Sequence, residues 1–405
     1  MRTRAVIAIT LCSVLSACAG ANTSTYSLPG VRGQADERRR SGTLGPVVTS
    51  QFGGEIFGWD IDQNGSDGVL TETVLGNTGL VLNAIETFDQ TTGKITKVVR
   101  KTVRSNADVE PVADAIAGSD VGIIDVAHNY PSRGFIRDDH FAVMNPVSSD
   151  RITGKSAPRN PTGLVPSFVT NNQSSSSELM MGFIENKRHV DVPVYYTYDA
   201  SHNRWGRREG FPHSQLFDIG FPLYAAVDSQ TNVAVTGYLG RPRYNPHESP
   251  RFDMIDAATG KLMRTFQGLG LGFINGMAID STSGTMCTTT SKDMDVEFYD
   301  LSTRKGIAVQ IPTLYGGGPL TQGAAVAADP INHLCLVAQL NSTFDPLGGS
   351  TVIVYDEHGN LIEYINGFSF LDPFSVVVPH LAVNAVNRTG YVNGPGQNQL
   401  QEFSY

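Results

Sequence analysis

The feature that most constrains this chain is a short unit, an aspartate followed by a tight turn, that recurs between β-rich runs. One copy reads Ile255-Asp256-Ala-Ala-Thr-Gly260-Lys261, and another reads Tyr355-Asp356-Glu-His-Gly359-Asn360. The aspartates of the copies are Asp89, Asp199, Asp256, Asp300 and Asp356. A turn signal between two short β-rich runs predicts a hairpin. A strand-turn-strand unit that recurs every ~40–55 residues is typical of a β-propeller, with one such hairpin in each blade.

A second repeat is offset from the first and has the same period. Small or apolar residues lead into an acidic or amide turn residue at Asp62, Asp228, Asp280, Asp329 and Asn384. Each of these residues is followed by another β-rich run. Together the repeats predict four strands per blade, with an inner pair turned at the second repeat and an outer pair turned at the first. The long gap between Asp89 and Asp199 predicts a divergent copy near Asn145.

The last repeat is incomplete, because after 389–393 the chain supplies only one more strand, at 399–405. An open blade edge would invite edge-to-edge pairing, and residues 46–50 are placed to provide the missing outer strand. We therefore predict an all-β fold, a β-propeller of seven four-stranded blades closed by an N-terminal strand. Six or eight blades are the alternatives, because 108–163 is poorly patterned. The propeller is expected to occupy 51–405.

The N-terminus carries the clearest short motif. A basic start and an apolar stretch at 5–15 are followed by Leu15-Ser16-Ala17-Cys18, which is the layout of an export signal. The motif resembles the lipobox of bacterial lipoproteins, a family in which the cysteine is acylated and becomes the mature N-terminus. The resemblance implies a signal peptide at 1–18 and palmitate-type acyl chains on Cys18. An ordinary secretory signal that contains a cysteine is the alternative.

The same resemblance implies a location. Ala19, rather than an aspartate, follows the cysteine, which in Gram-negative lipoproteins favours the outer membrane, with the body facing the periplasm or the cell surface. Residues 19–50 are rich in small and polar residues and predict a flexible tether. No later segment has the ~18 consecutive apolar residues of a membrane span. The net charge of −9 argues against nucleic acid as a partner.

Two cysteines remain outside the signal peptide and its lipid site, namely Cys287 and Cys335. Each follows the inner turn of its own predicted blade. Equivalent positions in neighbouring blades are normally too far apart for a disulfide, whose Cα atoms lie within about 7 Å. We therefore expect two buried free thiols. A zinc site is disfavoured, because the sequence has no Cys-x-x-Cys or His-x-x-x-His pair.

One stretch is similar to a calcium-binding loop. It offers oxygen ligands at the first, third and fifth positions, a glycine at the sixth and a further aspartate; the candidate metal ligands are Asp60, Asp62, Asn64 and Asp67. The twelfth position is Thr71, however, and not the glutamate of an EF-hand loop. The alternative is that Asp62 is the inner-turn residue of the first blade and that Asn64-Gly65 is ordinary turn chemistry. We expect no resident cofactor apart from this possible calcium ion.

Two further groups of residues are candidates for a site. Residues just before the inner strands should approach the axial channel, so the catalytic candidates are His380, Asn275 and Gln322. Two long segments, 129–172 and 240–251, have the length of functional loops; their candidate ligand-binding residues are Arg137, His140, Arg243 and His247. The alternative for each residue of these segments is a decorated surface loop without function.

The strand-Asp-x-x-Thr-Gly-Lys-strand units resemble those of the YVTN, NHL and lactonase-type seven-bladed propellers, over most of 51–405. That grouping shares its scaffold among binding proteins, hydrolases and lyases, and fold alone does not decide function. The sequence lacks a Gly-x-Ser-x-Gly elbow, a P-loop and a dinucleotide fingerprint. We therefore predict a lipid-anchored binding or scaffold protein of the cell envelope, with a protein or glycan partner. A lactonase-like hydrolase or a lyase with a site at the axial mouth is the alternative.

Overall fold

The structure is a computed structural model, and every regular element in its described residues is a β-strand. The described residues are 42–62, 65–75, 80–104, the strands between 113 and 210, 224–238, 249–259, 261–272, 274–290, 295–311, 322–340, 350–368, 380–393 and 398–405. From 99 to 224 the backbone of the strands is described without their side chains. The described part of the chain includes no helix with the length and apolarity of a membrane span.

The described strands form eight sheets; seven of them are numbered as blades 1 to 7 in chain order, and the eighth is a two-stranded hairpin. Blade 1 contains β2 (Glu55–Ile61), β3 (Asp67–Leu75), β4 (Leu80–Asp89) and β5 (Ile95–Arg104). Blade 2 contains β6 (Ala113–Ile116), β7 (Val121–Val126) and β10 (His140–Met144), with the hairpin of β8 (Asn129–Tyr130) and β9 (Phe135–Ile136) inserted before β10. Blade 3 contains β11 (Leu164–Asn172), β12 (Ser177–Glu185), β13 (Asp191–Asp199), β14 (Arg204–Trp205) and β15 (Glu209–Gly210).

The remaining blades are the best described. Blade 4 contains β16 (Tyr224–Asp228), β17 (Val233–Tyr238), β18 (Arg251–Asp256) and β19 (Leu262–Gln267). Blade 5 contains β20 (Ile274–Asp280), β21 (Thr285–Thr290), β22 (Asp295–Asp300) and β23 (Lys305–Gln310). Blade 6 contains β24 (Gln322–Asp329), β25 (Leu334–Leu340), β26 (Ser350–Asp356) and β27 (Leu361–Phe368). Blade 7 contains β28 (Leu381–Asn384), β29 (Thr389–Asn393), β30 (Gln399–Ser404) and β1 (Leu44–Thr49).

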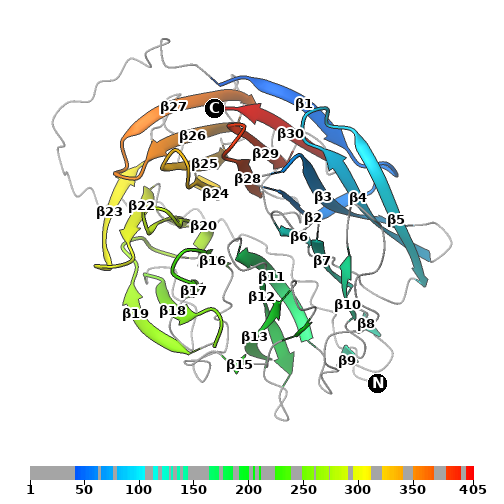
Figure 1. Cartoon of the computed structure of the whole chain (residues 1–405), viewed down its shortest axis with the longest axis horizontal. Coiled ribbons are helices and arrows are strands. Elements are labelled where there is room, and N and C mark those ends of the chain that lie inside the picture. The colour runs from blue at the N-terminus through cyan, green and yellow to red at the C-terminus, as the bar shows by residue number, and fades with distance from the viewer. Residues whose placement is uncertain are drawn as a thin grey trace, which may run out of the picture.

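The blades follow one another around a central axis and close into a ring (Figure 1). The first strand of each blade is innermost and contacts the first strand of the next blade; the contacts run from β2 through β6, β11, β16, β20, β24 and β28 back to β2. The predicted all-β propeller with seven blades is therefore confirmed. The divergent repeat also falls where the sequence predicts it, because β10 ends at Met144, directly before Asn145.

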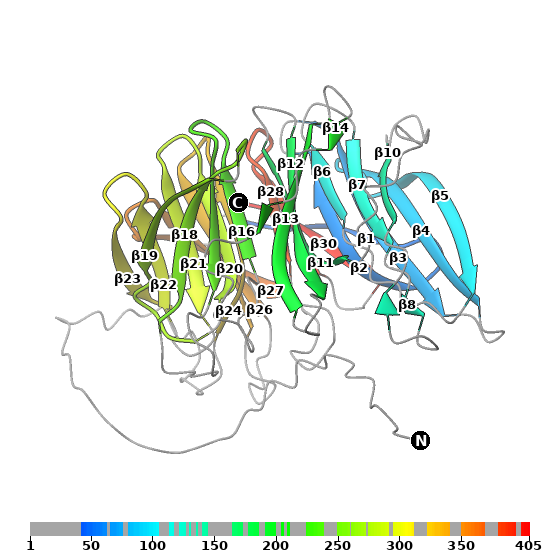
Figure 2. The same ribbon diagram turned by 90° about the horizontal axis from the view of Figure 1, so that it is seen from below.

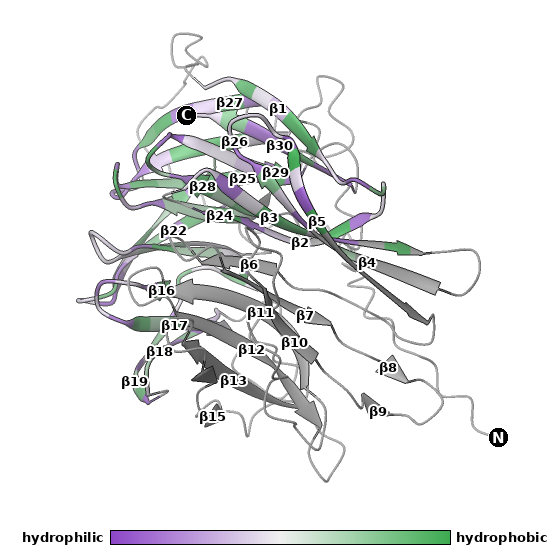
Figure 3. Ribbon diagram, turned by 45° about the vertical axis from the view of Figure 1, so that its right-hand side comes forward, coloured by the Kyte–Doolittle hydropathy of each residue, from purple (hydrophilic) through white to green (hydrophobic). Residues whose placement is uncertain are grey.

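The ring is closed by the N-terminal strand, as predicted. β1 pairs antiparallel with β30, so that Val48 lies opposite Leu400 and Leu44 lies opposite Phe403. The Val48 side chain is completely buried in a cluster that includes Trp59 of blade 1 and Tyr391 of blade 7. Hydrophobic and hydrophilic residues are interleaved along β1 and β30 (Figure 3), as expected for strands that bury one face. Blade 7 thus joins the two ends of the described chain.

The two ends of the ring differ in their connections. At one end, which we call the turn end, four-residue turns join the first strand to the second at 229–232, 281–284, 330–333 and 385–388. The third strand is joined to the fourth at the same end. At the opposite end, the loop end, the chain passes from the second strand to the third and from blade to blade. These connections vary in length: 76–79 and 291–294 are as short as the turns, whereas 312–321, 341–349 and 369–380 are longer. Figure 2 shows the strands running between these two ends.

Neighbouring blades approach most closely at their inner strands. Gly276 on β20 faces the backbone of β24, where an added Cβ would lie 2.7 Å from the nitrogen of Val326 and 3.0 Å from the Cα of Ala325. A Cβ atom cannot occupy that space, so the position requires glycine. This small residue lets the inner strands of blades 5 and 6 come together near the axis.

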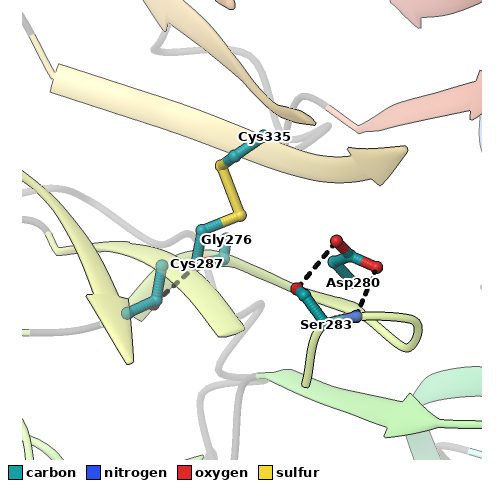
Figure 4. The surroundings of a disulfide bond; sticks show 6 residues. Gly276, Asp280, Ser283, Cys287 and Cys335 are labelled. Atoms are coloured by element: carbon teal, nitrogen blue, oxygen red, sulfur yellow. Dashed lines mark hydrogen bonds between the residues drawn. A yellow bond between two sulfur atoms is a disulfide. The ribbon is translucent and has the colours of Figure 1, made fainter. Parts of the chain in front are cut away.

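The close approach places Cys287 and Cys335 within reach of each other, and they form a disulfide with a Cα–Cα distance of 6.6 Å (Figure 4). The prediction of two free thiols is therefore wrong. The reason is a one-residue offset: Thr285 lies opposite Asp280 and Leu334 lies opposite Asp329. Cys287 is two residues beyond Thr285, whereas Cys335 is one residue beyond Leu334. Because successive strand residues point to opposite faces, the two cysteines face each other across the blade junction.

Candidate functional site

The recurrent aspartates hold the turns at the turn end. Asp280 accepts hydrogen bonds from the backbone N–H groups of Thr282 (2.8 Å) and Ser283 (3.2 Å), and Figure 4 shows Ser283 against this carboxylate. The same pattern recurs at Asp228, Asp329, Asn384, Asp256 and Asp300. Hydrogen bonds from Thr259 and Ser302 lower the pKa values of Asp256 and Asp300, respectively. These side chains therefore act as turn supports.

The predicted catalytic residues occupy the loop end of three successive inner strands. His380 directly precedes β28, whereas Asn275 is the second residue of β20 and Gln322 is the first residue of β24. Only His380 thus stands before its strand, as predicted for all three. Asn275 is half-buried, and the side chain of Gln322 lies outside the described residues. All three residues therefore lie at the same end of the ring.

His380 belongs to a small cluster at the junction of blades 7 and 1. Its ring lies edge-on against Trp59, with a centroid distance of 4.8 Å. The Oδ1 atom of Asn393 accepts hydrogen bonds from the indole N–H of Trp59 (2.7 Å) and the backbone N–H of His380 (3.4 Å). His380 is exposed, yet desolvation by the protein around it lowers its pKa, and the charge of Asp60 opposes that shift. The imidazole is therefore neutral at neutral pH.

The residues of the predicted calcium loop form the inner turn of blade 1. The N–H of Asp62 donates to the carbonyl of Asp67 (2.9 Å), and the amide group of Gln90 donates to the carbonyls of Asp62 (2.8 Å) and Asp67 (2.7 Å). Asp60 is buried within β2. These contacts follow the turn alternative. Asn64 lies outside the described residues, so calcium binding there stays a prediction.

The other predicted site residues lie outside the described side chains. Arg137, Arg243, His247 and the lipidation residue Cys18 are all outside the described residues. His140 is the first residue of β10, where it pairs with Val126, and its side chain is not described. Their binding and lipidation roles therefore stay predictions.

Two buried glutamates hold the connection between β1 and β2 at the loop end. Glu86 accepts hydrogen bonds from the N–H of Gln51 at 3.1 and 3.0 Å, and Glu72 accepts from the N–H groups of Phe52 (3.2 Å) and Gly54 (2.6 Å). Both glutamates are completely buried. Burial, and then the hydrogen bond with Glu72, raise the pKa of Glu86 from 4.5 to about 8. Glu86 therefore keeps its proton at neutral pH, because ionisation would place a charge in a buried site beside another carboxyl group.

We expect Glu86→Gln to stabilise the protein increasingly as the pH rises from 4.5 to about 8. The native state holds this proton more tightly than the unfolded state. The contribution of Glu86 to native stability is therefore fully present below pH 4.5 and is lost as the pH rises toward the native pKa. Glutamine imitates the protonated carboxyl and removes that loss. Each unit of pKa corresponds to about 1.4 kcal/mol, so the gain should be on the order of a few kcal/mol at pH 8.5.

Urea denaturation of both proteins between pH 5 and 9 measures the difference. Lys305→Gln, at an exposed lysine, is the control substitution. A stability difference that does not change with pH would contradict the raised pKa of Glu86.

A cluster of His and carboxylate side chains lies at the turn end between blades 5 and 6. The Nδ1 atom of His333 lies 2.8 Å from Oδ2 of Asp280 and 3.9 Å from Oε2 of Glu357. The hydrogen bond with Asp280 raises the pKa of His333. Sequence reasoning missed this cluster, because its members come from three different turns. The visible signal is the position of His333, which matches Gly284 and Asn232 in the turns of blades 5 and 4 and shares their positive φ.

Comparison with known proteins identifies the fold. No protein-family model matches the sequence, and no curated protein matches it. The β-propeller domain of Cps50 (Swd1) from Myceliophteria thermophila is 9% identical, with a TM-score of 0.55 over 90% of this chain and 99% of that one. The chain is a β-propeller. The RRP9 WD40 repeats (9% identity, TM-score 0.56, 89% and 99% covered) and a chain of the mitotic checkpoint complex (10%, 0.53, 95% and 98%) are similar to this propeller in the same way.

Proposed function

We propose that this propeller is a lipid-anchored binding protein of the bacterial cell envelope that holds its partner at the loop end. The observation that carries the proposal is the difference between the two ends of the ring. At the turn end, the recurrent aspartates are engaged in four-residue turns. At the loop end, the connections vary in length and include long segments such as 312–321 and 369–380. Variable connections on a rigid frame are the usual place for recognition.

The disulfide supports the extracytoplasmic part of the proposal. Cys287 and Cys335 are almost completely buried and link two blades. Structural disulfides persist in oxidising compartments, which include the periplasm and the cell surface. This agrees with the export signal and lipobox-like motif that end at Cys18. The signal and the crosslink come from different parts of the chain and indicate the same side of the membrane.

The course of β1 supports the choice of the loop end. Leu44 pairs with Phe403, and Tyr405 donates its backbone N–H to the carbonyl of Arg388 in the inner turn of blade 7. The described chain therefore begins at the turn end. A tether from Cys18 would enter there and leave the loop end open to a partner. The neighbour in the mitotic checkpoint complex is a propeller within a complex, which favours a protein as the partner.

Lipidation is tested by Cys18→Ala. We expect this change to abolish labelling of the protein by an alkyne-tagged palmitate analogue, and to release the protein from washed membranes into the soluble fraction. The physical reason is that two or three acyl chains give stable anchoring, whereas the tether and the ring offer no comparable apolar segment. Cys12→Ala is the control, because that cysteine precedes the predicted cleavage site. Unchanged labelling of Cys18→Ala would contradict the lipid anchor.

The loop end is tested by photo-crosslinking in living cells. A benzophenone amino acid is placed at Leu269, an exposed apolar residue of a loop-end connection, or at Val386, its counterpart at the turn end; their exposed fractions are 49% and 57%. Adducts are identified by mass spectrometry as protein or glycan. We expect adducts from position 269 and none from position 386. Adducts from position 386 alone would place the partner at the wrong end for this proposal.

A further inference from the structure

Beyond the proposed binding function, three turns at the junction of blades 5 and 6 bring together a nitrogen and two carboxylate oxygens. Asp280 ends β20, His333 closes the inner turn of blade 6, and Glu357 follows β26. One ligand atom from each lies within 4.8 Å of the other two. The side chain of Asp280 is 6% exposed, whereas those of His333 and Glu357 are 43% and 30% exposed. The cluster thus has a buried base and a side that is open to solvent.

Asp280 is already oriented by its own turn. Its Oδ1 atom accepts the N–H groups of Thr282 and Ser283, and its Oδ2 atom accepts the hydroxyl of Ser283 at 2.8 Å. Outer contacts of this kind fix the direction of a metal-binding carboxylate before the ion arrives. His333 presents Nδ1 to the same Oδ2 atom at 2.8 Å. Two of the three groups are therefore held in place in the protein as it stands.

A small pocket adjoins these groups. Its lining includes Asp280, His333 and Glu357, together with Phe298 and the disulfide of Cys287 and Cys335. Its size suits about one water-sized species. The polar groups therefore converge over an apolar floor, and there is room for a single small ion or water molecule. Such an arrangement strengthens charge interactions, because the apolar floor excludes competing solvent.

The junction of blades 6 and 7 has an equivalent turn whose carboxylate has a different partner. At the junction of blades 6 and 7, Asp329 is the equivalent of Asp280, and its Oδ2 atom accepts the hydroxyl of Tyr405 at 2.9 Å. A neutral hydroxyl satisfies that carboxylate. At the junction of blades 5 and 6, an imidazole takes the place of the hydroxyl and Glu357 stands 3.9 Å from it. Asp280 alone supports its turn, so the turn does not need the nearby side chains of His333 and Glu357.

We propose that Asp280, His333 and Glu357 bind a divalent transition-metal ion, with Zn²⁺ as the probe. One nitrogen and two oxygen ligands suit zinc and its neighbours, whereas calcium and magnesium prefer oxygen alone. Zinc lies about 2.0–2.2 Å from such atoms. The partly exposed side chain of Glu357 must turn inward to complete the set. The pocket supplies the remaining position, which a water molecule or a ligand would occupy. The ion would crosslink two blades directly beside the disulfide.

The test is zinc titration of the intact, detergent-solubilised protein after treatment with a chelating resin, followed by calorimetry. Thiol reductants are omitted, because reduced Cys287 and Cys335 would bind zinc themselves. We expect one zinc ion per chain, with Ca²⁺ and Mg²⁺ at millimolar concentration failing to compete. His333→Asn should lower the affinity about a hundredfold or more, and Glu357→Gln about tenfold or more, since each removes a ligand.

We expect His333→Asn to keep the fold, because an asparagine already occupies the equivalent turn position in blade 4. The φ angle is 58° at Asn232 and 55° at His333. Asparagine accepts this conformation more readily than most residues. The metal-free melting temperature of the variant should therefore match that of the parent. His358→Asn, at an exposed histidine next to Glu357, is the matched control and should leave the zinc affinity unchanged.

Two results would overturn the proposal. One is a dissociation constant of about 0.1 mM or weaker for zinc and the parent protein, which is the affinity of weak surface contacts. The other is zinc binding that survives in both His333→Asn and Glu357→Gln. The cluster would then be a hydrogen-bonded junction between two blades. Neither result would bear on the partner at the loop end, which is tested separately by crosslinking.

Discussion

Val48→Asp should abolish the cooperative folding of this protein. Val48 is completely buried in β1, where it packs in one cluster with Trp59, Phe88 and Tyr391. An aspartate at this point would place an unpaired carboxylate in the apolar contact between the first and last blades. The strand that closes the ring would detach and leave β30 as an open edge. We expect a loss of about 4 kcal/mol or more in the free energy of unfolding, measured by urea denaturation.

Val47→Asp is the matched control for this prediction. Val47 is the preceding residue of the same strand, faces the opposite side and is 39% exposed. A charge there meets solvent, so the free energy of unfolding should change by only about 0.5 kcal/mol. Equal effects of the two substitutions would show that β1 does not close the ring in the register described.

Removal of the disulfide should have the second largest effect on stability. Cys287 and Cys335 are separated by 48 residues. In the chain-entropy description, a crosslink over a loop of that length stabilises the native state by about 4 kcal/mol, because it restricts the unfolded chain. The double variant Cys287→Ala, Cys335→Ala should therefore unfold at a lower urea concentration than the parent.

Reduction provides the internal control for the disulfide. Dithiothreitol should lower the urea midpoint of the parent to nearly that of the double variant, and it should leave the midpoint of the variant unchanged. Thiol titration under denaturing, non-reducing conditions should find neither Cys287 nor Cys335 free. Two reactive thiols from these residues in the unfolded parent would contradict the crosslink.

The propeller could be predicted from the sequence because each blade repeats its own local chemistry. Asp300 and Asp356 hold their turns through hydrogen bonds to residues two to four positions later, and such contacts leave a pattern in the order of residues. The closing strand followed from the same count, since the final repeat lacked an outer strand. These are short-range or arithmetical signals, so one sequence was enough.

The contacts between blades could not be predicted in that way. The disulfide depends on which face of the strand each cysteine occupies, and an offset of one residue reverses the face. His333 contacts Asp280 because two turns from different blades lie side by side. The spacing of the repeats along the sequence does not reveal that these turns are neighbours in space. No repeat or motif in the sequence marks Glu86, whose carboxyl group holds the connection at Gln51. The candidate site therefore needed the structure.

The pairing of β1 with β30 also sets the order in which the protein can fold. Thr43 and Ser404 are hydrogen-bonded partners separated by 361 positions in the chain. If the chain crosses the membrane with its N-terminus first, as proposed, β1 arrives early. The partner strand β30 then arrives only after almost the whole protein has crossed. Long-range closure of this kind is slow, and the waiting edge is open to aggregation. We therefore expect the edge of the unfinished ring to stay exposed until β30 pairs with β1.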